Sequence, residues 1–381
     1  MEHDVSNEPG QAPPPPVIPA NPPPLITPPP PPPRPPRQGK AWMKIAIVLG
    51  ILLVFSVLSN LRHLVHGVTV RAKSGRQARE HLEEVTFENN QSKNKIAVLD
   101  ITGIISSEPW DRTTHNLVDL ISDQLRLAGE DDSAKAVVLR VDSPGGEVLA
   151  SDEIYRAIVD FEKDYKKPVV ASMGGLAASG GYYVSAPCRW IVANELTITG
   201  SIGVIMHSYN YRGLLNKVGV RPEVFKSGKF KDMLSGEKDE EDILPEEKQM
   251  VQSLIDETFE RFKKVVAEGR ENASEQNSGA GRHLADNWKD YADGRVLSGK
   301  QAYELGFVDE LGNFDTAVER ARQLARIKDA NLVQYQRPFD LGNLFRLFGK
   351  SESRAVKIDL GMQLPNLQVG RLYFLSPTVL H

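Results

Sequence analysis

Short apolar runs alternate with amphipathic segments through the middle of the chain. Runs of four to ten residues bounded by polar or glycine-rich turns are typical of buried strands. They predict strands at residues 96–105, 136–141, 169–171, 190–193, 203–206 and 223–225. Apolar side chains three or four positions apart mark helices between them, as in Ile154, Ala157, Ile158 and Phe161. We therefore predict an α/β fold, either a parallel sheet or a spiral of strand–strand–helix units.

The pattern changes after residue 240. Pro245 and two acidic residues open a long amphipathic helix, as expected for the first turn of a helix. A helix is also predicted at 211–218, and the folded domain is predicted to span residues 95–327. Residues 328–381 lack a strong pattern and are predicted to be a peripheral tail with one apolar stretch at 372–375.

The N-terminal part has no globular pattern. Residues 1–40 contain 17 of the 26 prolines, which predicts an extended, disordered tail. Residues 41–61 contain an uncharged run of 17 residues and predict an uncleaved transmembrane anchor, since the preceding segment is too long for a signal peptide. Residues 62–94 are polar and predict a stalk. Basic residues flank the anchor on both sides, so the positive-inside rule gives no orientation.

Composition removes several classes of function. The net charge of −4 and the absence of a concentrated basic face argue against a nucleic-acid binder. Cys188 is the single cysteine, so neither an intramolecular disulfide nor a cysteine-based metal site can form.

Ser179 is the candidate nucleophile. It stands in a segment of small residues, Met-Gly-Gly-Leu-Ala-Ala-Ser-Gly-Gly at 173–181, where a strand meets a predicted helix. Such crowding by small residues lets another backbone approach the hydroxyl closely. A serine nucleophile also needs a base. The candidates are His207 and His283 for a histidine triad, and Lys226, Lys229 and Lys231 for a serine–lysine pair.

Gly145 and Gly146 follow a predicted strand in the sequence Asp-Ser-Pro-Gly-Gly. Paired glycines can turn successive amides towards one point, which suits a developing oxyanion. A phosphate cradle is the other use of such a loop, but the chain has no matching phosphate-binding motif.

Five ordered motifs together resemble the bacterial signal peptide peptidase A family. They are Asp-Ser-Pro-Gly-Gly at 142–146, Ala-Ala-Ser-Gly-Gly-Tyr-Tyr at 177–183, Thr-Gly-Ser-Ile-Gly-Val at 199–204, Lys-Ser-Gly-x-x-Lys-Asp at 226–232 and Asp-Gly-Arg-Val at 293–296. The resemblance covers residues 95–327. It implies a crotonase-like or Clp protease-like fold of strand–strand–helix units, preceded by one transmembrane helix. It also implies a single catalytic unit assembled as a homo-oligomeric ring.

The resemblance assigns roles by motif. Ser179 is expected to be the nucleophile and Lys231 the general base, with Ser201 holding the lysine. Gly145, Gly146 and the amide of Gly180 are expected to form the oxyanion hole. This chemistry calls for no metal or cofactor. The resemblance implies a serine endopeptidase in the bacterial inner membrane, with its catalytic domain outside the cytoplasm, that degrades signal-peptide remnants or other peptides.

Two other classes compete with a protease. A crotonase-type acyl-CoA enzyme would share the fold and the oxyanion hole, but it needs neither an anchor nor a serine–lysine pair. A non-catalytic membrane scaffold would recruit partners through residues 1–40 and would not depend on Ser179.

Overall fold

The computed structural model describes residues 49–50, 53, 82–108, 116–337 and 371–376. The chain divides into two units, residues 1–79 and 80–381. The predicted proline-rich tail, most of the predicted anchor and most of the predicted stalk lie outside the described residues. No helix among the described residues is long and apolar enough to cross a membrane.

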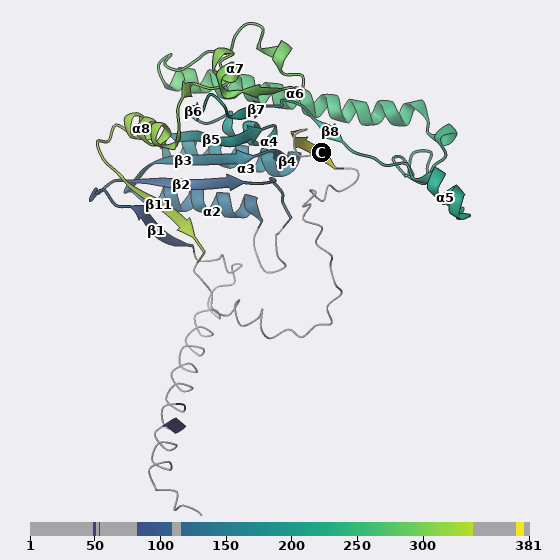
Figure 1. Cartoon of the computed structure of the whole chain (residues 1–381), viewed down its shortest axis with the longest axis horizontal. Coiled ribbons are helices and arrows are strands. Elements are labelled where there is room, and N and C mark those ends of the chain that lie inside the picture. The colour runs from purple at the N-terminus through teal and green to yellow at the C-terminus, as the bar shows by residue number, and fades with distance from the viewer. Residues whose placement is uncertain (1–48, 51–52, 54–81, 109–115, 338–370, 377–381) are drawn as a thin grey trace, which may run out of the picture. The chain divides into compact units, whose positions relative to one another are not determined.

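The second unit is a mixed α/β fold (Figure 1). Its elements run in the order β1 Glu83–Glu88, β2 Lys95–Thr102, α2 Leu117–Glu130, β3 Ala134–Ser143, β4 Gly145–Glu147, α3 Val148–Tyr165, β5 Val169–Ala178, α4 Gly180–Ser185, β6 Trp190–Ala193, β7 Ile198–Gly200, β8 Ile205–Met206, α5 Arg212–Val218, η1 Glu240–Asp242, α6 Pro245–Gln276, η2 Trp288–Tyr291, β9 Val296–Ser298, α7 Gly299–Glu304, β10 Glu310–Leu311, α8 Phe314–Leu324, β11 Asn331–Gln336 and β12 Leu372–Leu375.

The main sheet has nine strands. Its central path follows the order β1-β11-β2-β3-β5-β6-β10, and β7 and β9 extend from β5. The strands from β11 to β10 pair in parallel, while β1 pairs antiparallel with β11. A second sheet has the order β4-β12-β8. Only Pro144 separates β3 from β4, so this chain segment passes directly from one sheet to the other and then enters α3.

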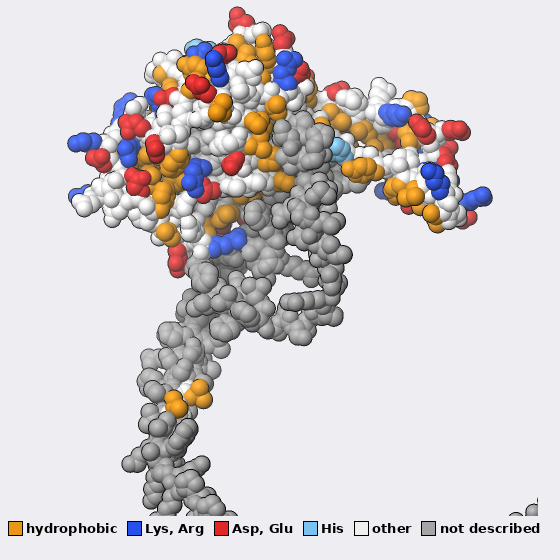
Figure 2. Space-filling model, in the orientation of Figure 1, with side chains coloured by type: hydrophobic (Ala, Val, Ile, Leu, Met, Phe, Trp, Pro, Cys, Tyr) orange, Lys and Arg blue, Asp and Glu red, His pale blue; other side chains and the backbone are white. Residues whose placement is uncertain are grey.

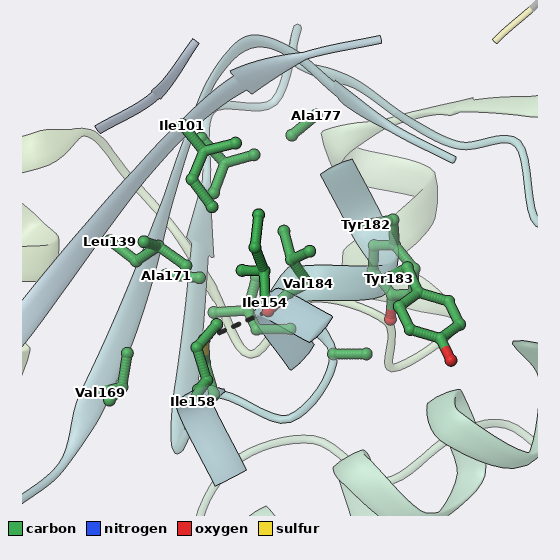
Figure 3. Packing of buried hydrophobic residues seen from close by; sticks show 14 of the residues in the cluster. Ile101, Leu139, Ile154, Ile158, Val169, Ala171, Ala177, Tyr182, Tyr183 and Val184 are labelled. Carbon is green, nitrogen blue, oxygen red and sulfur yellow. Dashed lines mark hydrogen bonds between the residues drawn. The ribbon is translucent and has the colours of Figure 1, made fainter. Parts of the chain in front are cut away.

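Both faces of the main sheet are buried. Ile101, Leu139 and Ala171 pack with Ile154 and Ile158 of α3 in the larger core cluster (Figure 3). Neighbouring strand residues such as Ile96 and Val98 point to the other face, where they pack in a second cluster with Ala317, Val318 and Ala321 of α8. Burial on both faces explains why these strands are continuous apolar runs in the sequence.

Three segments differ from the sequence-based expectation. No strand forms at 223–225, where Phe225 is 93% exposed. β1 lies within the segment predicted as a stalk, and it pairs with β11 in the segment predicted as a tail. The apolar stretch at the chain's end forms β12 between β4 and β8. β1 and β12 pair with strands that are distant in the sequence, and residues 223–225 pair with no strand among the described residues.

The chain between β8 and the middle of α6 forms an arm, which we define as residues 207–258. In Figure 1 its α5 lies at the end away from the sheet. α6 has 32 residues, and its fully buried apolar residues begin at Phe262. Its first turns therefore project from the domain as part of the arm.

Candidate active site

Ser179 joins β5 to α4 in a strained conformation. Its φ of 56° and ψ of −115° are unusual for a residue with a side chain, and such strain persists only where the surroundings impose it. Its backbone N–H donates to the Gly200 carbonyl at 2.8 Å. The residue is fully buried, and its Oγ has no hydrogen-bond partner among the described residues. A buried hydroxyl without a partner is a group available for chemistry.

The glycine loop at 145–146 packs directly against the residue after Ser179. Gly145 has a φ of 101°, and a Cβ at that position would lie 2.6 Å from the Gly180 nitrogen. A Cβ on Gly180 would in turn lie 3.0 Å from the Gly145 Cα and 3.1 Å from the Gly146 nitrogen. Only glycines permit this approach, and it brings the backbone nitrogens of Gly146 and Gly180 to the same small space.

The Gly145 amide differs from its neighbours. It donates to the Ser143 Oγ at 3.1 Å, and that hydroxyl donates to the Gly103 carbonyl at 2.6 Å. The Gly145 N–H is therefore already used to fix the loop. The expected group of three amides reduces to Gly146 and Gly180 as donors, with Gly145 shaping the turn.

Ser201 lies beside Ser179 because β5 and β7 pair in parallel. Ala178 is in register with Gly200, so the residues that follow them are adjacent. Ser201 is buried at a φ of 50°, and its N–H donates to the Arg295 carbonyl at 2.7 Å. Hydrogen bonds from the Arg295 guanidinium lower the pKa of Asp293 to about 2. The Asp-Gly-Arg motif is thus a clamp that holds the Ser201 turn in place.

Lys231 lies in the arm, away from this cluster. It is exposed, and its Nζ makes no ion pair or hydrogen bond with a described residue, Ser179 included. The other two candidate lysines are paired: Lys226 with Asp232 at 2.8 Å and Lys229 with Glu246 at 3.1 Å. Within one chain the structure brings together four of the motifs, and it leaves Lys231, the expected general base, apart from them.

Neither candidate histidine contacts the serine within the described residues, since Ser179 Oγ has no partner there. His207 directly follows β8, and its Nε2 is buried without a partner. His283 Nδ1 lies 3.5 Å from Ser274 Oγ. The described residues therefore contain no histidine paired with Ser179. Nor do the described residues include a group of His, Cys, Asp or Glu that could hold a metal ion.

Sequence reasoning missed an aromatic cluster that begins one helical turn after the serine. Tyr183 of α4, Phe262 of α6 and Phe374 of β12 pack their rings against one another in the core. Tyr183 belongs to a recognised motif, and the apolar run 372–375 was visible in the sequence. What joined them could not be seen, because about 190 residues separate the two segments.

Several known proteins and two family profiles resemble this chain. The profile of peptidase family S49 matches residues 162–328, and the Clp protease profile matches residues 70–189. A protein of Synechocystis sp., provisionally described as a protease, is 38% identical over 273 residues, covering 71% of this chain and 89% of that protein. A protein of Enterococcus faecium, provisionally described as signal peptide peptidase SppA, is 33% identical over 310 residues, covering 78% of this chain and 84% of that protein. A solved structure of a membrane-bound stomatin-specific protease with a substrate peptide covers 68% of this chain and 98% of that chain, at 16% identity and a TM-score of 0.38.

Proposed function

This chain belongs to peptidase family S49 and is a serine peptidase, and on that premise we propose that it cleaves peptides with a Ser179–Lys231 dyad. The family resemblance inferred from the five motifs is confirmed. The observation that carries the proposal is the buried Ser179 Oγ, which has no partner among the described residues and lies beside two glycine amides.

The proposed mechanism is acyl transfer. Ser179 Oγ gives its proton to Lys231 Nζ and forms a bond to the substrate carbonyl carbon. The oxyanion accepts hydrogen bonds from the amides of Gly146 and Gly180. The C–N bond then breaks, Lys231 returns the proton to the leaving amine, and water hydrolyses the acyl-enzyme. In this proposal Ser201, which is adjacent to Ser179, holds the lysine.

We propose that Lys231 reaches the serine of a neighbouring copy in a homo-oligomeric ring. Among the three lysines of its motif it is the one without an ion-pair partner in the described residues. A lysine acts as a base only when apolar cover disfavours its charged form. The arm that carries it exposes such cover, including Leu214, Val218 and Phe225. Figure 2 shows hydrophobic side chains gathered on the arm.

The substrate and the compartment extend the proposal. We place the enzyme in the bacterial inner membrane, anchored by residues 41–61, with the catalytic unit outside the cytoplasm. Its substrates would be signal-peptide remnants or other peptides released at the membrane. Family membership as a serine peptidase disfavours the acyl-CoA and scaffold alternatives, because neither needs Ser179 as a nucleophile.

A peptidase assay on the full chain in detergent tests the dyad. Ser179→Ala and Lys231→Ala are each expected to lower kcat by a factor of about 10³ to 10⁶. Lys226→Ala and Lys229→Ala are the matched controls, since they remove a lysine from the same motif. Full activity in Ser179→Ala or in Lys231→Ala would rule the dyad out.

Mixing tests the neighbouring-copy arrangement. Ser179→Ala and Lys231→Ala chains are each expected to be inactive alone, and the experiment co-expresses the two. If the dyad forms between copies, mixed rings contain sites with an intact Ser179 from one chain and an intact Lys231 from the other. We expect activity to return in the mixture. A mixture as inactive as its parents would place both residues in one chain.

A further inference from the structure

Four side chains of alternating charge form a continuous chain of ion pairs in the arm. Lys226 Nζ lies 2.8 Å from Asp232 Oδ2, and Lys238 Nζ lies 3.6 Å from Asp232 Oδ1. Lys238 Nζ also lies 2.6 Å from Glu247 Oε1, in the first turn of α6. Asp232 directly follows Lys231, the proposed base. These ion pairs therefore connect α6 to the residue beside Lys231.

The end of this series nearest α6 is buried. The Glu247 side chain is 3% exposed and the Lys238 side chain 9%, whereas Lys226 at the other end is 37% exposed. Leu234 and Ile243 line the same pocket as Lys238 and Glu247. Low exposure reduces screening by water and salt. Removing either partner of the Lys238–Glu247 pair would leave a buried charge uncompensated.

Asp232 ties the turn that carries Lys231 to the rest of the arm. The backbone of the turn is held by local hydrogen bonds, such as that from the Lys231 N–H to the Gly228 carbonyl at 3.2 Å. Local bonds shape a turn, but they do not fix where it lies in the molecule. The Asp232 carboxylate supplies that connection, because Lys238 pairs with it and also with Glu247.

α6 gives the connection a rigid base. It is one helix of 32 residues that runs from the arm back to the sheet, where Phe262 is fully buried (Figure 1). Lys229 and Glu246 form another link between the turn and α6, but their side chains are 55% and 52% exposed. Exposed ion pairs contribute little. The buried Lys238–Glu247 pair is therefore the ion pair best suited to fix the position of the turn.

Lys238 is a poor candidate for the base itself. A lysine acts as a base only when its neutral form is populated. The hydrogen bond from Lys238 to Glu247, together with the charges of Glu247 and Asp232, raises the pKa of Lys238. Lys238 therefore stays charged, which suits a residue that holds a carboxylate in place.

We propose that Lys238 and Glu247 are positioning residues for the peptidase reaction, which act through Asp232 to hold the turn that presents Lys231 Nζ to Ser179. This rests on the proposed function and adds to it two residues that lie outside the five motifs. Neither residue touches the substrate. Their loss should slow the chemical step and leave substrate binding unchanged.

A kinetic experiment on the full chain in detergent tests this role. Lys238→Met and Glu247→Gln each break the buried pair with little change in side-chain size. One readout is hydrolysis of fluorescein-labelled casein, and the other is the rate at which a fluorophosphonate labels Ser179. We expect each variant to lower kcat by a factor of about 10 to 10², with KM unchanged within about twofold, because a small misplacement of a catalytic group is costly. The labelling rate should fall by the same factor.

Arg212→Met is the matched control. It breaks another ion pair of the arm, in which Arg212 Nη2 lies 3.1 Å from Asp239 Oδ2 and the Arg212 side chain is 19% exposed. Neither partner belongs to the turn that carries Lys231. The control should keep kcat and the labelling rate even if its melting temperature falls. Glu247→Gln is the variant that decides the test if Lys238→Met does not fold, because its amide can still accept a hydrogen bond from Lys238.

The same panel includes Lys231→Ala, which separates this inference from the dyad. If Lys231→Ala is inactive but Lys238→Met and Glu247→Gln keep full kcat and labelling, the proposed function stands and the positioning role fails. Full activity in Lys231→Ala would overturn both. The role also fails if Arg212→Met loses as much activity, if KM rises in place of the fall in kcat, or if the mass by sedimentation falls with the activity, since the pair would then act on assembly.

Discussion

At the scale of single residues, the site depends on backbone positions where a side chain has no room. Gly145 combines a φ of 101° with a neighbour, the Gly180 nitrogen, 2.6 Å from where a Cβ would lie. We expect Gly145→Ala to lower kcat/KM by at least about 10², because it displaces the amides that face the oxyanion. Gly279→Ala is the control: its φ is 81°, and no atom lies within 4 Å of its Cβ position. Peptidase kinetics and melting curves on both variants check this, and equal losses of activity would contradict it.

Ser179 itself is strained, which leads to a stability prediction. At φ 56° and ψ −115° a side chain costs on the order of 1–3 kcal/mol, whereas glycine tolerates such angles. Both Ser179→Gly and Ser179→Ala should be inactive, but the glycine variant should melt at the higher temperature. Calorimetry measures the difference. A glycine variant that melts below the alanine variant would show that the turn stores no strain.

Some residues of the site could be predicted from sequence motifs, and others could not. Ser179, Gly145, Gly146, Gly180 and Ser201 stand in short motifs, and β-sheet register brings those motifs together. The use of the Gly145 amide by Ser143 could not be predicted, since it depends on one hydroxyl rotamer. Pairing of Tyr183 with Phe374 depends on a contact between distant segments.

At the scale of elements, the junction from α3 to β5 contains a buried acid. Glu162 Oε1 accepts from the Val169 N–H at 2.6 Å, and burial raises the pKa of Glu162 to about 7. The folded state therefore holds this proton more tightly than the unfolded chain, in which the pKa is near 4.5. The contribution of Glu162 to the free energy of unfolding is complete below about pH 4.5. It is lost as the pH rises to 7, which lowers the free energy of unfolding by about 3 kcal/mol.

Glu162→Gln should remove this dependence, because the amide still accepts from Val169 and has no charge to bury. Relative to the unmodified chain, the variant should gain stability between pH 5 and pH 8. Glu153→Gln, on the exposed side of the same helix, should not. Melting temperatures of the three chains at pH 5 and pH 8 test this prediction. If the melting temperature changes equally with pH in Glu162→Gln and in the unmodified chain, Glu162 is not the source of the pH dependence.

Elements with local patterns were predictable, and those with distant partners were not. β2, β3 and the start of α6 follow from apolar runs and from Pro245 in the first turn. β1, β11 and β12 are short strands, and the strands that they pair with lie far away in the sequence. The segment Glu223-Val224-Phe225 predicted a strand, but Val224 and Phe225 are exposed and no strand forms at these described residues.

At the scale of the whole molecule, the arm carries an exposed apolar surface that the fold of one chain does not account for. Leu214, Val218, Val220, Val224 and Phe225 are each at least half exposed on it. Exposed apolar side chains gathered on one element mark an interaction surface. A second copy is the partner that the proposed dyad requires, since Lys231 is on the same arm.

Phe225→Asp tests whether the arm packs against another copy. The side chain is 93% exposed, so the substitution should leave the melting temperature of the isolated chain unchanged within a few degrees. In an interface the new carboxylate would be buried without a partner, which is strongly unfavourable. We therefore expect a smaller mass by sedimentation in detergent and a loss of peptidase activity of at least about 10², as Lys231 no longer reaches Ser179. Leu196→Asp, 86% exposed on the loop between β6 and β7, is the control and should keep both mass and activity. Wild-type mass and activity in Phe225→Asp would mean that the arm does not deliver Lys231 to a neighbour.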